Sequence, residues 1–227
     1  MKKSVCKNSD MVDVLYDMIY TCYNDSKFVI GLSGGSAAKP TCEALKLLHT
    51  RKDISNIWYI FCDERYVDRT SSDFTLNYYM INLFNEIKID KSHIICINPS
   101  LEIDQCAKKY NDDLSSLLNG KSIDLLLLGI GDDGHTCSLF PGHVLTKTKS
   151  ENLVDYLCDS PKPPSKRVTL LPQTVTNAKN RIYIVTGKGK ARIIERVFNN
   201  QEMPCVNCAP IENTMWLLDN EAAEFLK

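Results

Sequence analysis

Apolar residues recur along the chain at two spacings, and the first of these is helical. Met11, Val14, Leu15 and Met18 follow the i, i+3, i+4 spacing that places side chains on one face of a helix. The same spacing is clearest over residues 103–118. It predicts helices over 11–22, 36–50, 72–87 (capped near Ser72 or Asp73), 103–118 and 190–198.

Short apolar runs lie between these helices and predict strands. The run IDLLLLGI, at 123–130, has no polar alternation, which is typical of a central parallel strand that is covered on both faces. The other runs predict strands over 27–32, 56–62, 93–98, 166–171, 181–187 and from residue 214 into a short helix, with a loop over 141–166. Strands that alternate with helices of this length indicate an α/β layered sheet.

Composition narrows the class of protein. The chain has 227 residues, and we interpret 1–227 as a single domain with a sizeable core. Its 27 Lys and Arg balance 28 Asp and Glu, so we expect no nucleic-acid partner. No run reaches the roughly 18 apolar residues of a membrane span, and the N-terminus lacks the apolar core of a signal peptide. Most of the 10 cysteines lie in apolar runs, as reduced thiols do, so we expect a cytosolic protein with no membrane partner.

The loops that directly follow the predicted strands are the candidate site, because open α/β sheets bind ligands beyond the carboxyl ends of their strands. The first such loop is SGGS, at 33–36. Gly34 and Gly35 let the backbone approach a ligand, and the free N–H groups of a helix start favour an anion. Ser36 is expected to cap the following helix. A tight turn that binds nothing is the alternative.

Two more of these loops carry basic residues. Lys188 and Lys190 lie beside glycines in TGKGK. Together with the first loop, they suggest a phosphate site that is lined on two sides by backbone N–H groups and lysine side chains. Asp63 and Arg65 follow the strand at 56–62. The planar fork of an arginine there can clamp a phosphate or a carboxylate. The alternative is that these are solvated surface charges.

The loop GIGDDGH, at 129–135, carries a G-x-G-x-x-G pattern, but a dinucleotide fingerprint is a poor interpretation. Pro141 follows too soon for the long helix that such a fingerprint opens. Asp132 and Asp133 would also repel a pyrophosphate. The lone C-x-x-C at 205–208 has no partner pair that would indicate a metal site.

A metal site and a catalytic turn remain as interpretations of this loop. Asp133, His135 and His143 offer metal ligands, although their spacing is not a common one for zinc. Histidine titrates near neutral pH and can take a proton from water. Only His135 among the four histidines ends the most apolar strand beside a carboxylate. This favours a catalytic turn with His135 as general base, Asp133 as its orienting group and no metal.

The loops together carry a resemblance to the 6-phosphogluconolactonase family. The matching segments are LSGGS, FCDERYVDRTSSDFTLNY, DLLLLGIGDDGHTCSLFPG, PPSKRVTLLPQTVTNAK, VTGKGKA and WLLDNEAA, in order from about residue 28 to the C-terminus. The resemblance implies a Rossmann-like layered sheet, mostly parallel, with helices on both faces. It also implies hydrolysis of 6-phospho-D-glucono-1,5-lactone to 6-phospho-D-gluconate in the oxidative pentose phosphate pathway, without a cofactor.

The same resemblance assigns roles to residues of this chain. It implies His135 as the base, and basic side chains that meet the phosphate or the reacting carboxyl end of a sugar phosphate. The substrate-binding residues that it implies are Gly34, Gly35, Ser36, Asp63, Arg65, Arg167 and Lys190. Ala37 and Ala38 depart from the Thr and Pro that the family usually has. Some members are fused to glucose-6-phosphate dehydrogenase, which suggests a functional link to that enzyme.

Two rival functions differ from hydrolysis of a lactone. A glucosamine-6-phosphate deaminase of the same fold shares Asp63, Asp133 and His135, but it has Glu where this chain has Phe140 and Tyr where it has Arg65. A non-catalytic sugar-phosphate sensor would need an attached DNA-binding or partner module. The roughly 25 residues before the first predicted strand are too few for a helix-turn-helix domain.

Overall fold

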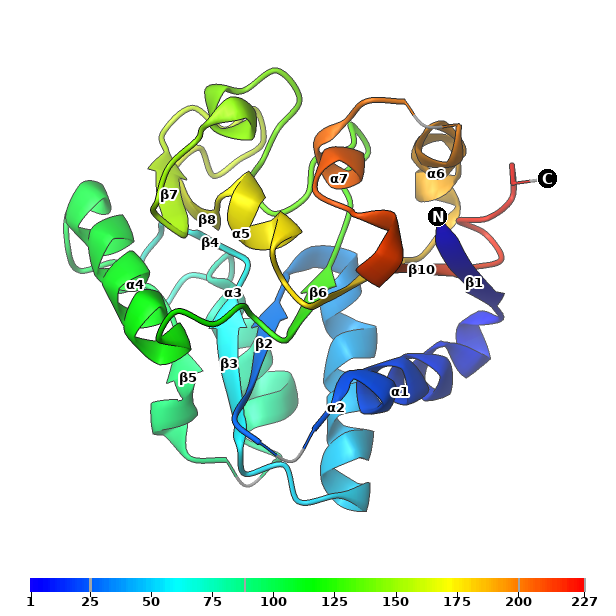
Figure 1. Cartoon of the computed structure of the whole chain (residues 1–227), viewed down its shortest axis with the longest axis horizontal. Helices are drawn as coiled ribbons and strands as arrows, with labels where there is room; N and C mark the ends of the chain where they lie inside the picture. The colour runs from blue at the N-terminus through cyan, green and yellow to red at the C-terminus, as the bar shows by residue number, and fades with distance from the viewer. Residues whose placement is uncertain (25, 88, 200, 227) are drawn as a thin grey trace.

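A parallel sheet forms the centre of the computed structural model, which describes residues 1–24, 26–87, 89–199 and 201–226 (Figure 1). Within these residues the sheet has seven strands, and each pairing in it is parallel. In spatial order they are β1 (Lys2–Cys6), β10 (Thr214–Asp219), β9 (Asn180–Val185), β6 (Leu125–Leu128), β2 (Phe28–Leu32), β3 (Ile57–Phe61) and β5 (Ile94–Ile95).

Both faces of this sheet are covered, and β6 shows why its sequence has no polar alternation. Leu125 and Leu127 pack into the core on one face, whereas Leu126 and Leu128 pack into the core on the other. The first face is covered by α1 (Met11–Cys22), α2 (Ala38–Arg51) and α3 (Thr75–Tyr79); the second by α4 (Ile103–Leu118), α5 (Pro172–Thr176), α6 (Ala191–Phe198) and α7 (Pro204–Asn207). The predicted α/β class with helices on both faces is confirmed. None of the helices in the described part of the chain has the length and apolarity to cross a membrane.

Besides the short strand β4 (Asp63–Arg65), which lies in the loop expected after β3, two strands lie where the sequence predicted none. β1 is an edge strand beside β10, and its residues are mostly exposed, so its sequence KKSVC shows little apolar signal. The expectation of about 25 residues before the first strand is therefore wrong. β7 (Val154–Leu157) lies inside the predicted loop 141–166 and buries only its two end residues. Strands that bury so few side chains lack the apolar run that predicts a strand.

β7 belongs to a second, antiparallel sheet, whose strand β4 follows the carboxyl end of β3. Its order is β4 (Asp63–Arg65), β8 (Arg167–Leu170) and β7. The strand that was predicted over 166–171 is thus β8, outside the central sheet. The short strand β4 lies where the sequence predicted a loop after β3.

Some boundaries also differ from the predicted ones. The predicted strand 93–98 is reduced to β5, and residues 220–225 form turns instead of the short helix expected after β10. The predicted helix 72–87 is split into α3 and a π-helical turn, η3 (Met80–Phe84). Its N-cap is Phe74, not Ser72 or Asp73. The Glu64 carboxylate caps it instead by accepting hydrogen bonds from the N–H groups of Thr75 and Leu76.

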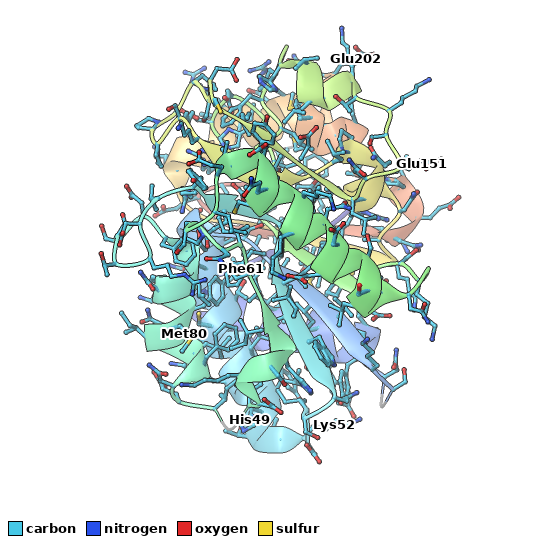
Figure 2. All side chains as sticks on the ribbon, turned by 90° about the vertical axis from the view of Figure 1, so that its left-hand side faces the viewer. His49, Lys52, Phe61, Met80, Glu151 and Glu202 are labelled. Carbon is cyan, nitrogen blue, oxygen red and sulfur yellow. The ribbon has the colours of Figure 1, made fainter. Side chains whose placement is uncertain are left out.

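The end of β3 is fixed by a side chain because β5 is too short to pair with it there. The hydroxyl of Tyr110, on α4, donates to the Phe61 carbonyl (2.7 Å) and accepts from the Phe61 N–H (2.8 Å). Figure 2 shows Phe61 in the interior, whereas Glu151 and Glu202 lie at the periphery. This fixed strand end leads directly into Asp63, at the edge of the candidate site.

Candidate active site

A cleft lies at the point where the order of the strands reverses. β2 is followed by β3 and β5 on one side, and β6 by β9 and β10 on the other, so the carboxyl ends of β2 and β6 adjoin at the reversal (Figure 1). Open α/β sheets bind ligands at such points. The cleft has an empty volume of about 650 Å³ and is lined by Ser33, Gly34, Gly35, Ser36, Asp63, Arg65, Gly129, Ile130, Gly131, Asp132, His135, Cys137, Lys162, Arg167 and Lys190.

The structure brings the predicted site residues together at this cleft. Each of them lines it except Asp133, which contacts His135. The sequence prediction missed Lys162 and Ser33. Lys162 lies in the predicted loop 141–166, where a single lysine among prolines and serines gave no signal of a site. Ser33 immediately precedes the glycines of the first loop and was not distinguished from them.

His135 and Asp133 form a hydrogen-bonded pair at the cleft. Asp133 Oδ1 accepts from the His135 backbone N–H (3.0 Å) and lies 2.6 Å from His135 Nδ1. Burial acts to raise the pKa of the Asp133 carboxyl, but the hydrogen bonds and charge of His135 outweigh it, so this pKa lies below its ordinary value. An ionised carboxylate only accepts, so the hydrogen lies on Nδ1, and in the neutral imidazole the lone pair is then on Nε2. The pair can therefore accept a proton through Nε2.

The glycines of G-x-G-x-x-G build the turn that holds this pair. The Gly131 N–H donates to the His135 carbonyl (2.8 Å), and the Gly134 N–H donates to the Gly131 carbonyl (3.1 Å). Gly134 has a φ of 89°, a conformation that favours glycine. The Phe140 ring packs on the imidazole, with the two ring centroids 4.5 Å apart. The pattern that resembled a dinucleotide fingerprint thus serves a tight turn.

The three side chains of the short strand β4 alternate between the cleft and the interior. Asp63 and Arg65 line the cleft, whereas Glu64 between them is buried. Asp63 accepts a hydrogen bond from the Ser138 hydroxyl (2.8 Å). Arg65 donates through Nη1 to the Thr75 hydroxyl (3.0 Å), and its buried Nε has no hydrogen-bond partner among the described residues.

Glu64 fastens β4 to α3 behind the cleft. Its carboxylate accepts hydrogen bonds from the backbone N–H groups of Arg65 (2.9 Å), Thr75 (2.8 Å) and Leu76 (3.0 Å). Its residue is 1% exposed, and this burial raises the pKa of its carboxyl from 4.5 to about 7, although the hydrogen bonds act to lower it. Glu64 therefore ionises near neutral pH in the folded protein.

This raised pKa predicts a fall in stability with rising pH. Between about pH 4.5 and 7 the unfolded chain loses the Glu64 proton while the folded chain keeps it, so the free energy of unfolding decreases across that window. The contribution is on the order of 3 kcal/mol, and Glu64→Gln should remove it. Chemical denaturation of both proteins from pH 4.5 to 8 measures it, with the exposed Glu151→Gln as control. Parallel profiles for wild type and Glu64→Gln would contradict the prediction.

Two basic residues reach the cleft from different elements. Arg167, at the start of β8, is 5% exposed, and its Nη1 lies 3.7 Å from Asp63 Oδ2. Lys190 ends the turn η6 (Lys188–Lys190) after β9. Burial lowers the pKa of Arg167 and of Lys190. Lys188 instead pairs with Glu224 (3.1 Å), so of the two lysines in this loop only Lys190 lines the cleft.

The first glycine loop also lines the cleft. The turn η2 (Gly35–Ala37) precedes α2, whose N-cap is Ala37, so the prediction that Ser36 caps the helix is wrong. Ser36 is exposed and lines the cleft. Ala37 and Ala38 are buried in the core between α2 and the sheet. Their departure from the family pattern therefore changes packing behind this loop.

The residues weighed for a metal site have other partners. His143 Nε2 lies 3.1 Å from Asp159 Oδ1, whereas Asp133 contacts His135. Over residues 1–24, 26–87, 89–199 and 201–226, no three Cys, His, Asp or Glu side chains are placed to hold one ion. Cys205 and Cys208 are buried free thiols.

Comparison with known proteins agrees with this geometry. The model of the family "Glucosamine-6-phosphate isomerases/6-phosphogluconolactonase" matches residues 8–216. The chain is 37% identical over 211 residues to the 6-phosphogluconolactonase of Bos taurus, covering 88% of this chain and 81% of that protein. It superposes on the 6-phosphogluconolactonase of Trypanosoma brucei with a TM-score of 0.84 and 27% identity, over 100% of this chain and 98% of that one.

The fold itself is shared more widely. A monomeric glucosamine-6-phosphate deaminase superposes with a TM-score of 0.80 and 24% identity, over 99% of both chains. A likeness at this identity shows a common fold and leaves the choice of reaction to the residues of the cleft.

Proposed function

The chain belongs to the glucosamine-6-phosphate isomerase/6-phosphogluconolactonase family, and we propose that this enzyme hydrolyses 6-phospho-D-glucono-1,5-lactone to 6-phospho-D-gluconate. The observation that carries the proposal is the His135–Asp133 pair at the edge of a cleft that basic side chains line. The pair offers a base, and the basic side chains suit a phosphorylated substrate. The 37% identity to a lactonase supports the same reaction.

In the proposed mechanism, water is the nucleophile. Nε2 of His135 takes a proton from water as its oxygen attacks the lactone carbonyl carbon. The carbonyl oxygen becomes an oxyanion, which a guanidinium group of the cleft stabilises. Collapse of the intermediate breaks the bond to the ring oxygen, which takes the proton from His135. Asp133 orients the imidazole and stabilises its charged form while it holds the proton.

The phosphate end of the substrate supplies binding energy at a distance from the reacting carbon. Arg65 has an unpartnered buried Nε, and Lys190 is partly desolvated, so both favour an anion. Gly34, Gly35 and Ser36 form a wall of the cleft that allows close approach of a ligand. Held at this end, the lactone ring is oriented toward His135.

Residues 1–227 would act as one catalytic domain in the cytosol, within the oxidative pentose phosphate pathway and without a cofactor or metal. Glucose-6-phosphate dehydrogenase would be the functional neighbour that forms the lactone. Neither nucleic acid nor membrane would take part.

Phe140 separates this proposal from deamination. Deamination with isomerisation moves protons among several atoms of the sugar and needs additional acid–base groups in register with the histidine. Here an apolar ring, 1% exposed, packs on the imidazole where the deaminase carries its glutamate. Lactone hydrolysis needs one base and an oxyanion site, the roles that we propose for His135 and for a guanidinium group of the cleft.

The test is a comparison of substrates. We expect the enzyme to form 6-phosphogluconate from freshly generated 6-phosphogluconolactone, well above spontaneous hydrolysis, when the product is followed with a coupled dehydrogenase. We expect no detectable ammonia from millimolar glucosamine 6-phosphate. Unphosphorylated glucono-1,5-lactone should react with a much lower kcat/KM because it lacks the phosphate. Ammonia release at a rate comparable to lactone hydrolysis would refute the proposal.

A further inference from the structure

Lys162 and Asp132 form an ion pair across the wall of the cleft, and the mechanism above uses neither of them. Asp132 lies in the turn after β6, whereas Lys162 lies in the segment between β7 and β8. The side chain of Lys162 is 38% exposed and that of Asp132 is 65% exposed. Surface ion pairs of this kind contribute little to the free energy of unfolding, so we consider a role for this pair in substrate binding.

The backbone at Lys162 is held firmly, which distinguishes it from a lysine on a free loop. The guanidinium of Arg167 donates to the carbonyls of Lys162 (3.1 Å), Pro163 (3.0 Å) and Pro164 (3.0 Å). The Ser160 hydroxyl also donates to the Lys162 carbonyl (2.8 Å). A buried arginine of the cleft thus fixes the residue that carries this ammonium group.

The charges that line the cleft do not cancel. Arg167 faces Asp63, and those two charges offset each other. Three other cationic groups remain, on Arg65, Lys162 and Lys190, and the carboxylates of Asp132 and Asp133 lie near the two lysines. This leaves an excess of one positive charge, so the cleft favours an anion.

We propose that Lys162 binds the phosphate of the substrate together with Lys190, and that Asp132 is its exchangeable partner in the empty cleft. The proposal rests on the lactonase function proposed above. On binding, the ammonium of Lys162 moves from the Asp132 carboxylate to a phosphate oxygen. Asp132 keeps the lysine at the cleft wall before binding and competes with the phosphate for it.

A contact of this kind acts on binding and leaves the chemical step unchanged. The phosphate is remote from the lactone carbon, so its interaction with Lys162 is equally strong in the ground state and the transition state. Loss of the contact should therefore raise KM with little change in kcat. It should do so only for a substrate that carries the phosphate.

The first experiment replaces Lys162 by Met and compares two lactones. We expect Lys162→Met to raise KM for 6-phosphogluconolactone, and the inhibition constant of 6-phosphogluconate, by about 10–100-fold with kcat within threefold. Its kcat/KM for glucono-1,5-lactone should stay within twofold of wild type, and Lys162→Arg should recover most of the loss. Lys166→Met, an exposed neighbour that does not line the cleft, is the matched control and should leave both reactions unchanged.

The second experiment tests the exchange. Asp132→Asn should lower KM for the phosphorylated lactone about 3–10-fold, and this gain should be under twofold in the Lys162→Met background. A rise in KM for Asp132→Asn would show that Asp132 holds Lys162 in its binding position. It would overturn the proposed movement of Lys162 from Asp132 to the phosphate. Equal effects of Lys162→Met on both lactones, or none, would overturn phosphate binding by Lys162. Failure of the proposed function is distinguishable, because wild type would then hydrolyse neither lactone above background.

Discussion

Replacement of His135 by Ala is expected to lower kcat for lactone hydrolysis by about 10²–10⁴-fold while the fold is kept. The imidazole lies at the cleft with Nδ1 against Asp133, so Nε2 is the atom that can take the proton of the attacking water. No other histidine among the residues that the structure describes lines the cleft. KM should change little, because the basic side chains that we propose to bind the phosphate remain.

Two further variants make the His135 result specific. Asp133→Asn keeps the shape of the pair but removes the charge that stabilises the protonated imidazole, so it should lower kcat less than His135→Ala does. His93→Ala removes a histidine that stacks on Trp58 at the amino end of β5, away from the cleft, and should leave kcat unchanged. Steady-state kinetics and thermal unfolding of the three variants provide the measurements. Activity of His135→Ala within threefold of wild type would remove His135 as the base.

The inner strands of the central sheet could be predicted from the sequence because they are buried on both faces. The leucines of β6 pack into both cores and leave a continuous apolar run, which is a strong local signal. β1 and β7 could not be predicted in the same way. Their stability comes from backbone pairing with β10 and with β8, and such pairing leaves little trace in their side chains.

The residues that line the candidate cleft could largely be predicted from the sequence, but the contacts that support them could not. The rule that ligands bind beyond the ends of parallel strands selected the loops that carry Ser36, Arg65, His135 and Lys190, which all line one cleft. Contacts made by residues distant in the chain were not predictable from a local pattern. Lys162 reaches the cleft because β8 pairs with β4, and Glu64 caps α3 across 11 positions of the chain.

Replacement of Gly131 by Ala is expected to abolish most lactone hydrolysis, although Gly131 bears no reactive group. A Cβ atom at this position would lie 2.0 Å from His135 Nδ1 and 2.6 Å from Asp133 Oδ1. Neither distance is compatible with van der Waals contact, so the imidazole must leave its place and its hydrogen bond with Asp133 must break. We therefore expect a loss of kcat close to that of His135→Ala, about 10²-fold or more.

The size of this loss of kcat depends on whether the backbone of the turn can move to make room for the methyl group. The Gly131 N–H donates to the His135 carbonyl and the Gly131 carbonyl accepts from Gly134, so the backbone on both sides of the new methyl group is hydrogen-bonded. The imidazole can rotate more easily than this backbone can move, so the fold should survive with the base misplaced. Gly189→Ala is the matched control, because a Cβ there meets no atom within 4 Å. Gly131→Ala should unfold within a few degrees of wild type but lack the activity that Gly189→Ala keeps; equal activity of the two variants would show that the turn relaxes around the methyl group.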